Sequence, residues 1–285
     1  MRQTMFQAIW LDVDGMRIHC LTAGESGTPV VLLHGAGADS ASLSWGKVIG
    51  PLSAHYQIFA PDLPGYGQSS RPDIQYTLDF YVDFVEHLLD ALNLEKVSLV
   101  GISMGGAIAL ALTLRASRRV EKLVLVDPYG IQDKVVAHRL SYLYVHLPFL
   151  DELSWWLIGR SRSLVQWTVL AGLIYNPARL SDELVDQVYQ AVREPRAGKA
   201  YISFQRSELR WSGLRNNLTS RLHKITVPTL LVYGAKDPAV PLACVQRAHA
   251  LIPNSKLSIM QECRHWPPGE KPEEFTYVVE SFLDV

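Results

Sequence analysis

The feature that most restricts the fold is a serine between two glycines at the junction of a strand and a helix. A short apolar run typical of a buried strand (KVSLV) leads into GISMGG at 101–106 and then into AIALALTL, which favours a helix. A serine on so tight a turn adopts strained backbone angles, and neighbouring chain passes close to the turn on both sides. Gly101 and Gly105 leave that space empty, so we expect the hydroxyl of Ser103 to project at the helix N-terminus.

A serine hydroxyl becomes a good nucleophile only when a neighbouring base removes its proton. Of the nine histidines, His265 alone lies just past a predicted C-terminal strand, at 256–260, in the loop sequence ECRHWP. Most of the others fall on predicted helices, strands or their ends, where we expect surface or core residues. His34 is expected to hold its own loop by hydrogen bonds. His265 is therefore the predicted general base for Ser103.

The third member of such a group must be a carboxylate that orients the imidazole and stabilises its charged form. Asp237 follows the predicted strand at 227–233, in LLVYGAKDPAVP, and Asp127 follows the predicted strand at 122–126, in LVLVDP. We favour Asp237. Asp127 stays a competitor because some folds place the acid one strand earlier, and its structural interpretation is a turn or helix-cap aspartate before Pro128.

A loop of small residues, HGAG at 34–37, comes directly after the apolar run VVLL. Small residues let a backbone N–H approach a carbonyl group closely, so the N–H groups of Ala36 and Met104 are predicted to form an oxyanion hole. The order along the chain is oxyanion loop, serine, acid and histidine. Four such elements in suitable contexts favour nucleophilic catalysis over a Gly-rich turn of purely structural use.

Alternating strand and helix patterns predict an α/β fold, with a mainly parallel sheet covered by helices on both faces. A DG pair at 14–15 predicts a hairpin between the first two strands. The alternation stops after Gly130, and residues 131–223 show only helical patterns. We therefore predict a core formed by 1–130 and 224–285, with an all-helical cap inserted at 131–223.

Composition argues against several other classes of protein. Lys and Arg number 27 against 28 Asp and Glu, so a formal net charge of -1 gives the chain no long-range field to hold nucleic acid or an anionic membrane. The three cysteines are widely spaced and match no zinc or disulfide pattern. No stretch has the length and hydropathy of a signal peptide or a membrane span. We expect a cytoplasmic protein with a small-molecule substrate, no metal and no cofactor.

These motifs together resemble the α/β-hydrolase superfamily over essentially the whole chain. The matching segments are HGAG at 34–37, DLPGYGQS at 62–69, GISMGG at 101–106, LLVYGAKDPAVP at 230–241 and the C-terminal His265. The resemblance implies an eight-stranded, mostly parallel sheet with a helical cap after the sixth strand, and no metal or organic cofactor. It also implies that Asp62, Gly65 and Gly67 shape a loop near the site without reacting.

Within the superfamily, HW at 265–266 and SMGG at 103–106 resemble the C–C bond hydrolases that cleave ring-fission products of aromatic catabolism. Those enzymes hold the substrate carboxylate with a cap arginine, whose position falls near the apolar Val188 in this chain; Arg193 and Arg196 lie off register. A substrate dianion would lack its bidentate partner there. We therefore predict hydrolysis of a small, mostly apolar carboxylic ester, with C–C bond hydrolysis of a 2-hydroxy-6-oxo-dienoate as the alternative.

The predicted substrate-binding residues are Gly37, Trp266 and Val188. The apolar cap sequence favours an apolar ester or ketone, because aliphatic and aromatic pocket walls bind such surfaces. A hypothesis of another class is a slow-turnover small-molecule receptor on the same fold. It would keep the same residues, so the rate of ester turnover has to separate the two.

Overall fold

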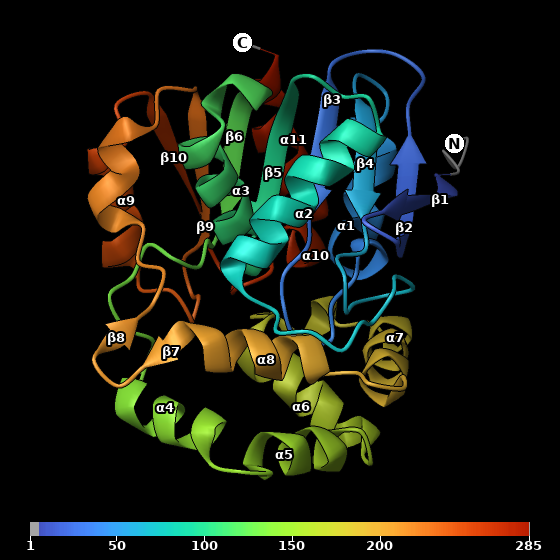
Figure 1. Ribbon diagram of the computed structural model, residues 1–285, viewed down its shortest axis with the longest axis vertical. Helices are drawn as coiled ribbons and strands as arrows, with labels where there is room; N and C mark the ends of the chain where they lie inside the picture. The colour runs from blue at the N-terminus through green and yellow to red at the C-terminus, as the bar shows by residue number, and fades with distance from the viewer. Residues whose placement is uncertain (1–5, 285) are drawn as a thin grey trace.

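The computed structural model describes residues 6–284 and contains one eight-stranded sheet (Figure 1). The strand order is β1-β2-β4-β3-β5-β6-β9-β10. Pairs β1–β2 and β2–β4 are antiparallel, and all later pairs are parallel. The strands are β1 (Gln7–Val13), β2 (Met16–Ala23), β3 (Pro29–Leu33), β4 (Gln57–Pro61), β5 (Val97–Ile102), β6 (Val120–Val126), β9 (Thr229–Gly234) and β10 (Ser255–Met260). The predicted mostly parallel sheet of eight strands is confirmed.

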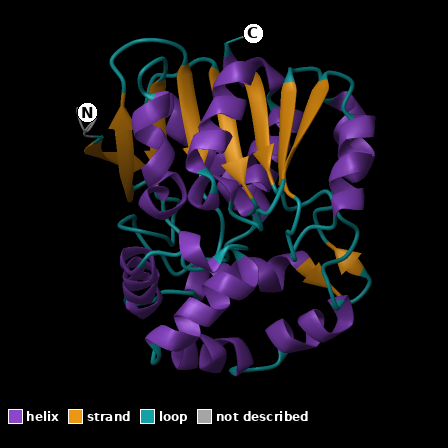
Figure 2. Ribbon diagram, turned by 180° about the vertical axis from the view of Figure 1, so that it is seen from behind, coloured by secondary structure: helices purple, strands orange, loops and turns teal. Residues whose placement is uncertain are grey.

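Helices cover both faces of this sheet (Figures 1 and 2). On one face lie α2 (Leu78–Ala91), α3 (Met104–Arg115) and α9 (Leu242–Leu251). On the other lie α1 (Ala41–Leu52), the short α10 (Pro267–Glu270) and α11 (Pro272–Leu283). A parallel sheet needs helices on both of its faces, because each strand directs apolar side chains to both faces.

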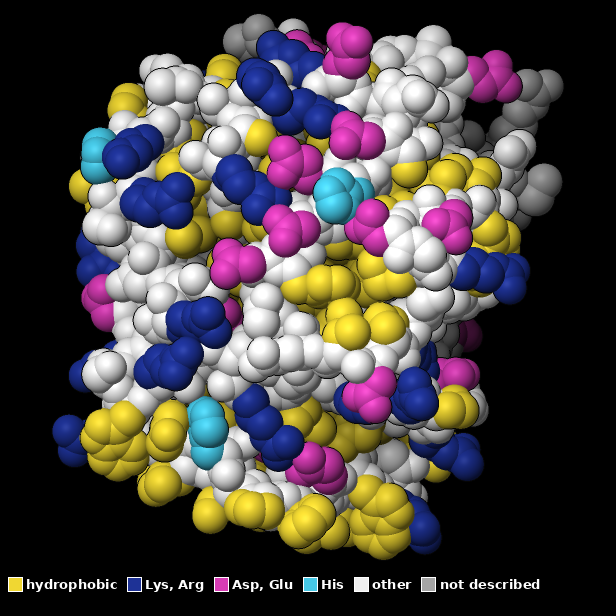
Figure 3. All heavy atoms as spheres, viewed as in Figure 1, with side chains coloured by type: hydrophobic (Ala, Val, Ile, Leu, Met, Phe, Trp, Pro, Cys, Tyr) yellow, Lys and Arg dark blue, Asp and Glu magenta, His cyan; other side chains and the backbone are white. Residues whose placement is uncertain are grey.

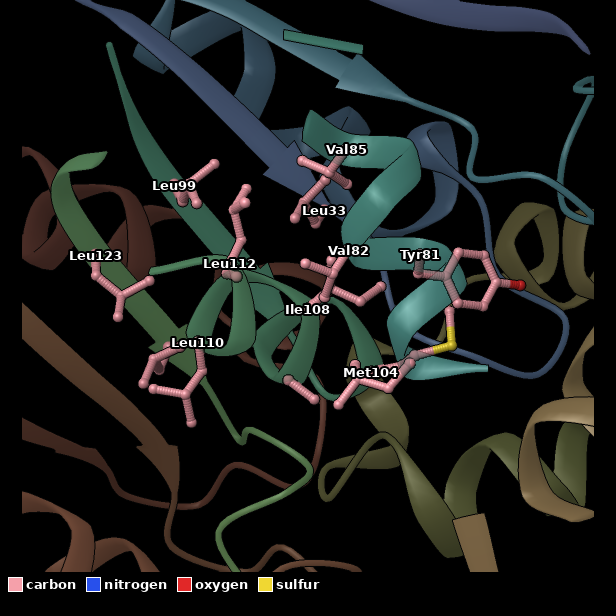
Figure 4. Packing of buried hydrophobic residues seen from close by; sticks show 14 of the residues in the cluster. Leu33, Tyr81, Val82, Val85, Leu99, Met104, Ile108, Leu110, Leu112 and Leu123 are labelled. Atoms are coloured by element: carbon pink, nitrogen blue, oxygen red, sulfur yellow. The ribbon is translucent and has the colours of Figure 1, made fainter. Parts of the chain in front are cut away.

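The apolar runs of the central strands explain why both faces are buried. Leu33 and Leu99 point to the α2–α3 side and pack with Ile108 (Figure 4), whereas Leu32 and Val100 belong to the cluster under α1 and α11. Successive side chains of a strand alternate between the faces, so an unbroken apolar run fills two cores at once. All five of these side chains are fully buried.

The N-terminal hairpin predicted from the DG pair is present. β1 and β2 pair from Gln7 opposite Thr22 to Val13 opposite Met16, and Asp14 and Gly15 form the turn with φ values of 53° and 74°. Positive φ at both central residues is what a two-residue turn needs to match the twist of its strands.

Between β6 and β9 the chain leaves the sheet and forms a separate layer, drawn below the sheet in Figure 1. We call this layer the cap. Its elements are α4 (His138–His146), α5 (Leu150–Ile158), α6 (Arg162–Gly172), α7 (Asp182–Arg193), α8 (Lys199–Glu208), β7 (Leu209–Arg210) and β8 (Gly213–Leu214), with single 3-10 turns at Pro177–Arg179 and Thr219–Lys224. No helix of residues 6–284 is long and apolar enough to cross a membrane.

The two-stranded ribbon β7–β8 corrects the expectation that residues 131–223 would be helical throughout. Leu209 and Leu214 face each other across it and bury their side chains with Val145 of α4. Gly213 permits this pairing, because a Cβ atom there would lie 2.8 Å from the carbonyl oxygen of Asp133. We retain 130/131 and 223/224 as the proposed limits of the cap.

Candidate active site

Ser103 lies at the turn from β5 into α3, with φ 52° and ψ −113°. This conformation is costly for any residue with a side chain, and the surrounding backbone holds it in place. The Ser103 N–H donates to the carbonyl of Val126 at 2.9 Å, and the Ser103 carbonyl accepts from the N–H of Tyr129 at 3.0 Å. Hydrogen bonds to the last residue of β6 and to the loop that follows it therefore fix the position of the serine backbone.

Two glycines of the turn have no room for a side chain. A Cβ atom on Gly101 would lie 2.3 Å from the carbonyl oxygen of Gly105, and one on Gly105 would lie 2.1 Å from that of Leu33. Both distances fall far inside van der Waals contact with backbone, which cannot swing away. The expected close approach of neighbouring chain on both sides of Ser103 is confirmed.

His265 and Asp237 lie side by side on the loops that follow β10 and β9. The Nδ1 atom of His265 is 2.8 Å from Oδ2 of Asp237, and Oδ1 of Asp237 accepts from the N–H of Ala239 at 2.7 Å. The Asp237 side chain is fully buried, and that of His265 is 13% exposed. A buried carboxylate that binds Nδ1 orients the ring and leaves Nε2 for another partner.

The close approach of these two loops depends on Gly234. A Cβ atom there would lie 1.9 Å from the carbonyl oxygen of Arg264, the residue before His265. Two backbone bonds join the loops: the N–H of Ala235 donates to Met260 at 2.9 Å, and that of Lys236 donates to Cys263 at 2.8 Å. The Asp237–His265 pair is therefore set by backbone contacts rather than by flexible side chains.

Asp127, the competing acid, is fully buried beside the pair. Its Oδ1 accepts from the N–H of Gly234 at 3.1 Å, whereas the carboxylate bonded to His265 is that of Asp237. Burial, and then the negative charge of Asp237, raise the pKa of Asp127 well above its usual range. Asp127 therefore holds its proton more tightly than an ordinary aspartate does, and it lies next to Asp237 without taking its place beside His265.

Side-chain atoms of Asp127, Asp237 and His265 lie within 4.8 Å of one another, the spacing of a metal site. His265 Nδ1 is already hydrogen-bonded to Asp237, and the raised pKa of Asp127 works against its deprotonation. A cation site needs free, deprotonated ligands. We propose no metal here.

The oxyanion loop is held by buried polar side chains. The His34 ring bonds at Nδ1 to the Gly35 carbonyl at 2.7 Å and accepts at Nε2 from the N–H of Leu63 at 3.0 Å. The carboxylate of Asp39 accepts from the N–H of Gly35 at 2.8 Å. Burial raises the pKa of Asp39, although its hydrogen bonds oppose the shift. The expectation that His34 serves this loop agrees with these contacts.

Two cavities meet at Ser103 and His265. The smaller, of about 260 Å³, is lined by Met104, Tyr129, Gln132, Val135, Val136, Phe204, Gln205, Glu208, Leu209 and Val240. The larger, of about 420 Å³, is lined by Gly35, Gly37, Ala38, Asp39, Leu43, Ile102, Thr168, Val169, Gly172, Leu173, Val188 and Trp266. Both are also lined by Ala36, Tyr201 and Ala239. We call them the small lobe and the large lobe.

Every site residue predicted from the sequence lies in this arrangement. Gly37, Val188 and Trp266 line the large lobe, Met104 lines the small lobe, and Ala36 borders both. Two larger hollows, of about 790 and 770 Å³, do not include Ser103 or His265. The two lobes, and not the two larger hollows, therefore adjoin the predicted nucleophile and base.

Sequence reasoning missed several residues of the lobes, notably Tyr201 and Phe204 on α8 and Thr168 on α6. No motif marks them, because only the packing of the cap on the sheet brings them to Ser103. Burial raises the pKa of Tyr201 to about 12, so its hydroxyl remains a hydrogen-bond donor between the two lobes. Glu208 closes the small lobe, and burial raises its pKa as well.

Comparison with known proteins identifies the family of the fold. A family model described as the alpha/beta hydrolase fold matches residues 28–272. The chain belongs to this family. The hydrolase is 31% identical to the 2-hydroxy-6-oxo-2,4-heptadienoate hydrolase of Pseudomonas putida, over 90% of each chain.

Two solved structures extend the comparison. One is a meta-cleavage product hydrolase from Pseudomonas fluorescens, with a TM-score of 0.82, 28% identity and 97% of each chain covered. The other is a bacterial membrane phospholipase A, with a TM-score of 0.77, 27% identity, and 98% of this chain and 86% of that chain covered. The first is named as a hydrolase of a meta-cleavage product, and the second as a phospholipase.

Proposed function

We propose that this hydrolase cleaves a small, mostly apolar, uncharged carboxylic ester through an acyl-enzyme. The observation that carries the proposal is the chemistry of the two lobes. Among the residues that line them, none is a lysine or an arginine, and the titratable side chains other than tyrosine are the acids Asp39 and Glu208 and the imidazole of His265. Such a pocket favours neutral substrates.

In the proposed reaction, Ser103 attacks the ester carbonyl while His265 takes its proton, and Asp237 holds the imidazole in the required tautomer. The backbone N–H groups of Ala36 and Met104 stabilise the oxyanion. His265 then protonates the leaving alcohol. A water molecule, activated by the same histidine, attacks the acyl-enzyme and releases the acid. The hydrogen bond of 2.8 Å between His265 and Asp237 supports these roles.

The two lobes suit the two halves of an ester. Both reach Ser103, so an acyl group in one leaves the alcohol in the other. Aliphatic and aromatic side chains dominate the walls, with Val188, Leu173 and Trp266 in the large lobe and Phe204 and Leu209 in the small one. We propose Gly37, Val188 and Trp266 as substrate-binding residues for the group in the large lobe.

The second candidate is hydrolysis of a C–C bond in a 2-hydroxy-6-oxo-dienoate, the class of compound in the name of the similar protein from Pseudomonas putida. The names of the similar proteins favour C–C bond hydrolysis over ester hydrolysis. Against it stands Val188, a buried apolar residue in the wall of the large lobe. A substrate carboxylate there would be desolvated without a cation, which costs several kcal/mol.

Steady-state kinetics on both substrate classes test the proposal. We expect p-nitrophenyl esters of short and medium chain length to have a higher kcat/KM than any 2-hydroxy-6-oxo-dienoate, with kcat of about 1 per second or more. If the kcat/KM of a 2-hydroxy-6-oxo-dienoate exceeds that of the esters by about tenfold or more, C–C bond hydrolysis is the function. Tight binding with turnover far below that rate on both classes indicates a small-molecule receptor instead.

A further inference from the structure

The outward side of the cap carries large hydrophobic side chains in solvent. Figure 3 shows them as a band along the lower edge of the molecule, over α4 and α5. The most exposed members lie on α4, α5, α6 and the loop after α4, and their exposed fractions run from 49% to 79%. They are Leu140, Leu147, Phe149, Leu153, Trp156 and Trp167. We call this set the apolar cap face.

Phe149 shows that folding alone does not account for this face. It is the most exposed member and has φ 64°, a left-handed conformation that bulky residues rarely adopt. Its ring thus gains no burial within the chain while its backbone carries strain. Contiguous apolar surface of this kind marks an interaction site.

Charge is distributed unevenly between the cap and the rest of the chain. Residues 131–223 contain 12 Lys and Arg against 8 Asp and Glu, a formal charge of +4, although the whole chain carries −1. Arg160 stacks over the ring of Trp156 at 4.2 Å, beside the exposed apolar residues. The near-zero net charge of the chain therefore conceals a basic cap, and the sequence argument against an anionic membrane surface does not hold for this layer.

Parts of the apolar cap face are adjacent in sequence to residues that line the two lobes. Trp167 points outward from α6, and the adjacent residues Thr168 and Val169 line the large lobe. Val136, just before α4, lines the small lobe and is itself 59% exposed. Exposed apolar side chains and side chains that line the lobes therefore occur on the same segments of the cap.

We propose that the apolar cap face docks on the surface of an anionic lipid bilayer. Aromatic and aliphatic side chains enter the interface, and flanking arginines contact the lipid head groups, which is the chemistry of proteins that lie on membranes. A second copy of this chain fits less well, because a twofold contact through this face brings two caps of charge +4 together. The inference is independent of whether the bond cleaved is an ester or a C–C bond.

Flotation with lipid vesicles tests the proposal, on protein that carries Ser103→Ala so that lipid hydrolysis does not alter the vesicles. We expect binding to vesicles of equal parts phosphatidylcholine and phosphatidylglycerol, weaker binding to phosphatidylcholine alone, and release at high salt. Adding Leu140→Gln and Phe149→Asn should lower the bound fraction at least about tenfold, since two large apolar contacts are lost. Asparagine tolerates the left-handed backbone at position 149.

The matched control is Tyr277→Gln on α11, which removes a side chain of similar exposure, 72%, from the sheet layer. It should bind vesicles like the parent protein. The proposal is overturned if the parent protein binds neither kind of vesicle, if the double variant binds as well as the parent, or if the double variant instead converts a dimer to a monomer. Hydrolysis of a soluble ester is measured separately, on the wild-type protein and on a Leu140→Gln, Phe149→Asn variant that keeps Ser103. A failure of docking and a failure of the proposed function are therefore distinguishable.

Discussion

The sheet core and the cap position their residues by different means. Around Ser103 and His265, backbone meets backbone so closely that a Cβ atom on Gly105 or Gly234 would lie about 2 Å from a carbonyl oxygen. In the cap, side-chain contacts hold the helices, such as the ion pairs of Arg162 with Asp182 and Asp186 between α6 and α7. The core is thus rigid where the proposed chemistry occurs, and the cap can vary in the residues that it presents to the substrate.

The sharpest test of this contrast is Ser103→Ala in the core. Ester hydrolysis should fall by about 10⁴-fold or more, because the attacking atom is lost, while the thermal unfolding midpoint changes little. Stopped assays on p-nitrophenyl esters and a melting curve measure both. Ser117→Ala, an exposed serine beyond the end of α3, is the control and should retain full activity. A Ser103→Ala protein that keeps a tenth of kcat contradicts the assignment.

The two buried acids of the core provide the next largest effect. Asp237→Asn should lower kcat by about 10³- to 10⁴-fold, because an amide next to His265 favours the wrong tautomer. Asp127→Asn should cost less than about tenfold, since the carboxylate bonded to His265 is that of Asp237 and the amide has a shape similar to the carboxyl. If steady-state kinetics instead show the larger loss of kcat for Asp127→Asn, then Asp127, at the end of β6, is the acid that orients His265.

In the cap, Val188→Arg should change selectivity rather than abolish activity. A cation in the wall of the large lobe should lower kcat/KM for neutral esters about tenfold and raise it for a 2-hydroxy-6-oxo-dienoate, because the carboxylate gains a partner. Gln187→Arg, on the exposed neighbouring position of α7, adds the same charge outside the lobes and should leave both values unchanged. Equal losses on both substrates would show that the lobe merely lost volume.

The smallest effect concerns stability against pH. The raised pKa of Asp127 means that the folded state keeps a proton that the unfolded chain releases above about pH 4. This contribution is fully present below the unfolded pKa and is lost as pH rises toward the folded pKa. Urea unfolding between about pH 4 and pH 7 should therefore show the wild type losing more stability with rising pH than Asp127→Asn does. Parallel curves for the two proteins would place an ionised Asp127 in the folded state.

Much of the core could be predicted because its signals are local. The turn around Ser103, the small-residue loop at Ala36 and the DG hairpin each depend on a few adjacent residues whose steric needs hold in any context. The continuous apolar runs of β3 and β5 likewise predict strands that are covered on both faces.

Other features depended on packing between distant segments. That His265 pairs with Asp237 and not with Asp127 follows from how the loops after β9 and β10 cross at Gly234. The lining by Tyr201 follows from where α8 lies against the sheet. Helical periodicity alone predicts an apolar stripe and does not say which neighbour covers it.

The cap shows this limit most clearly. It is a single layer with one side toward the sheet and the other toward solvent. Its helices carry apolar residues on both of these sides. The sequence by itself determined the hydrolase core and predicted its reactive groups, since backbone sterics and strand order act over short stretches. Only the tertiary structure decided which apolar cap residues, such as Val188, line the large lobe and which, such as Phe149, remain outside. Burial is a property of the packed layers and not of the residue type.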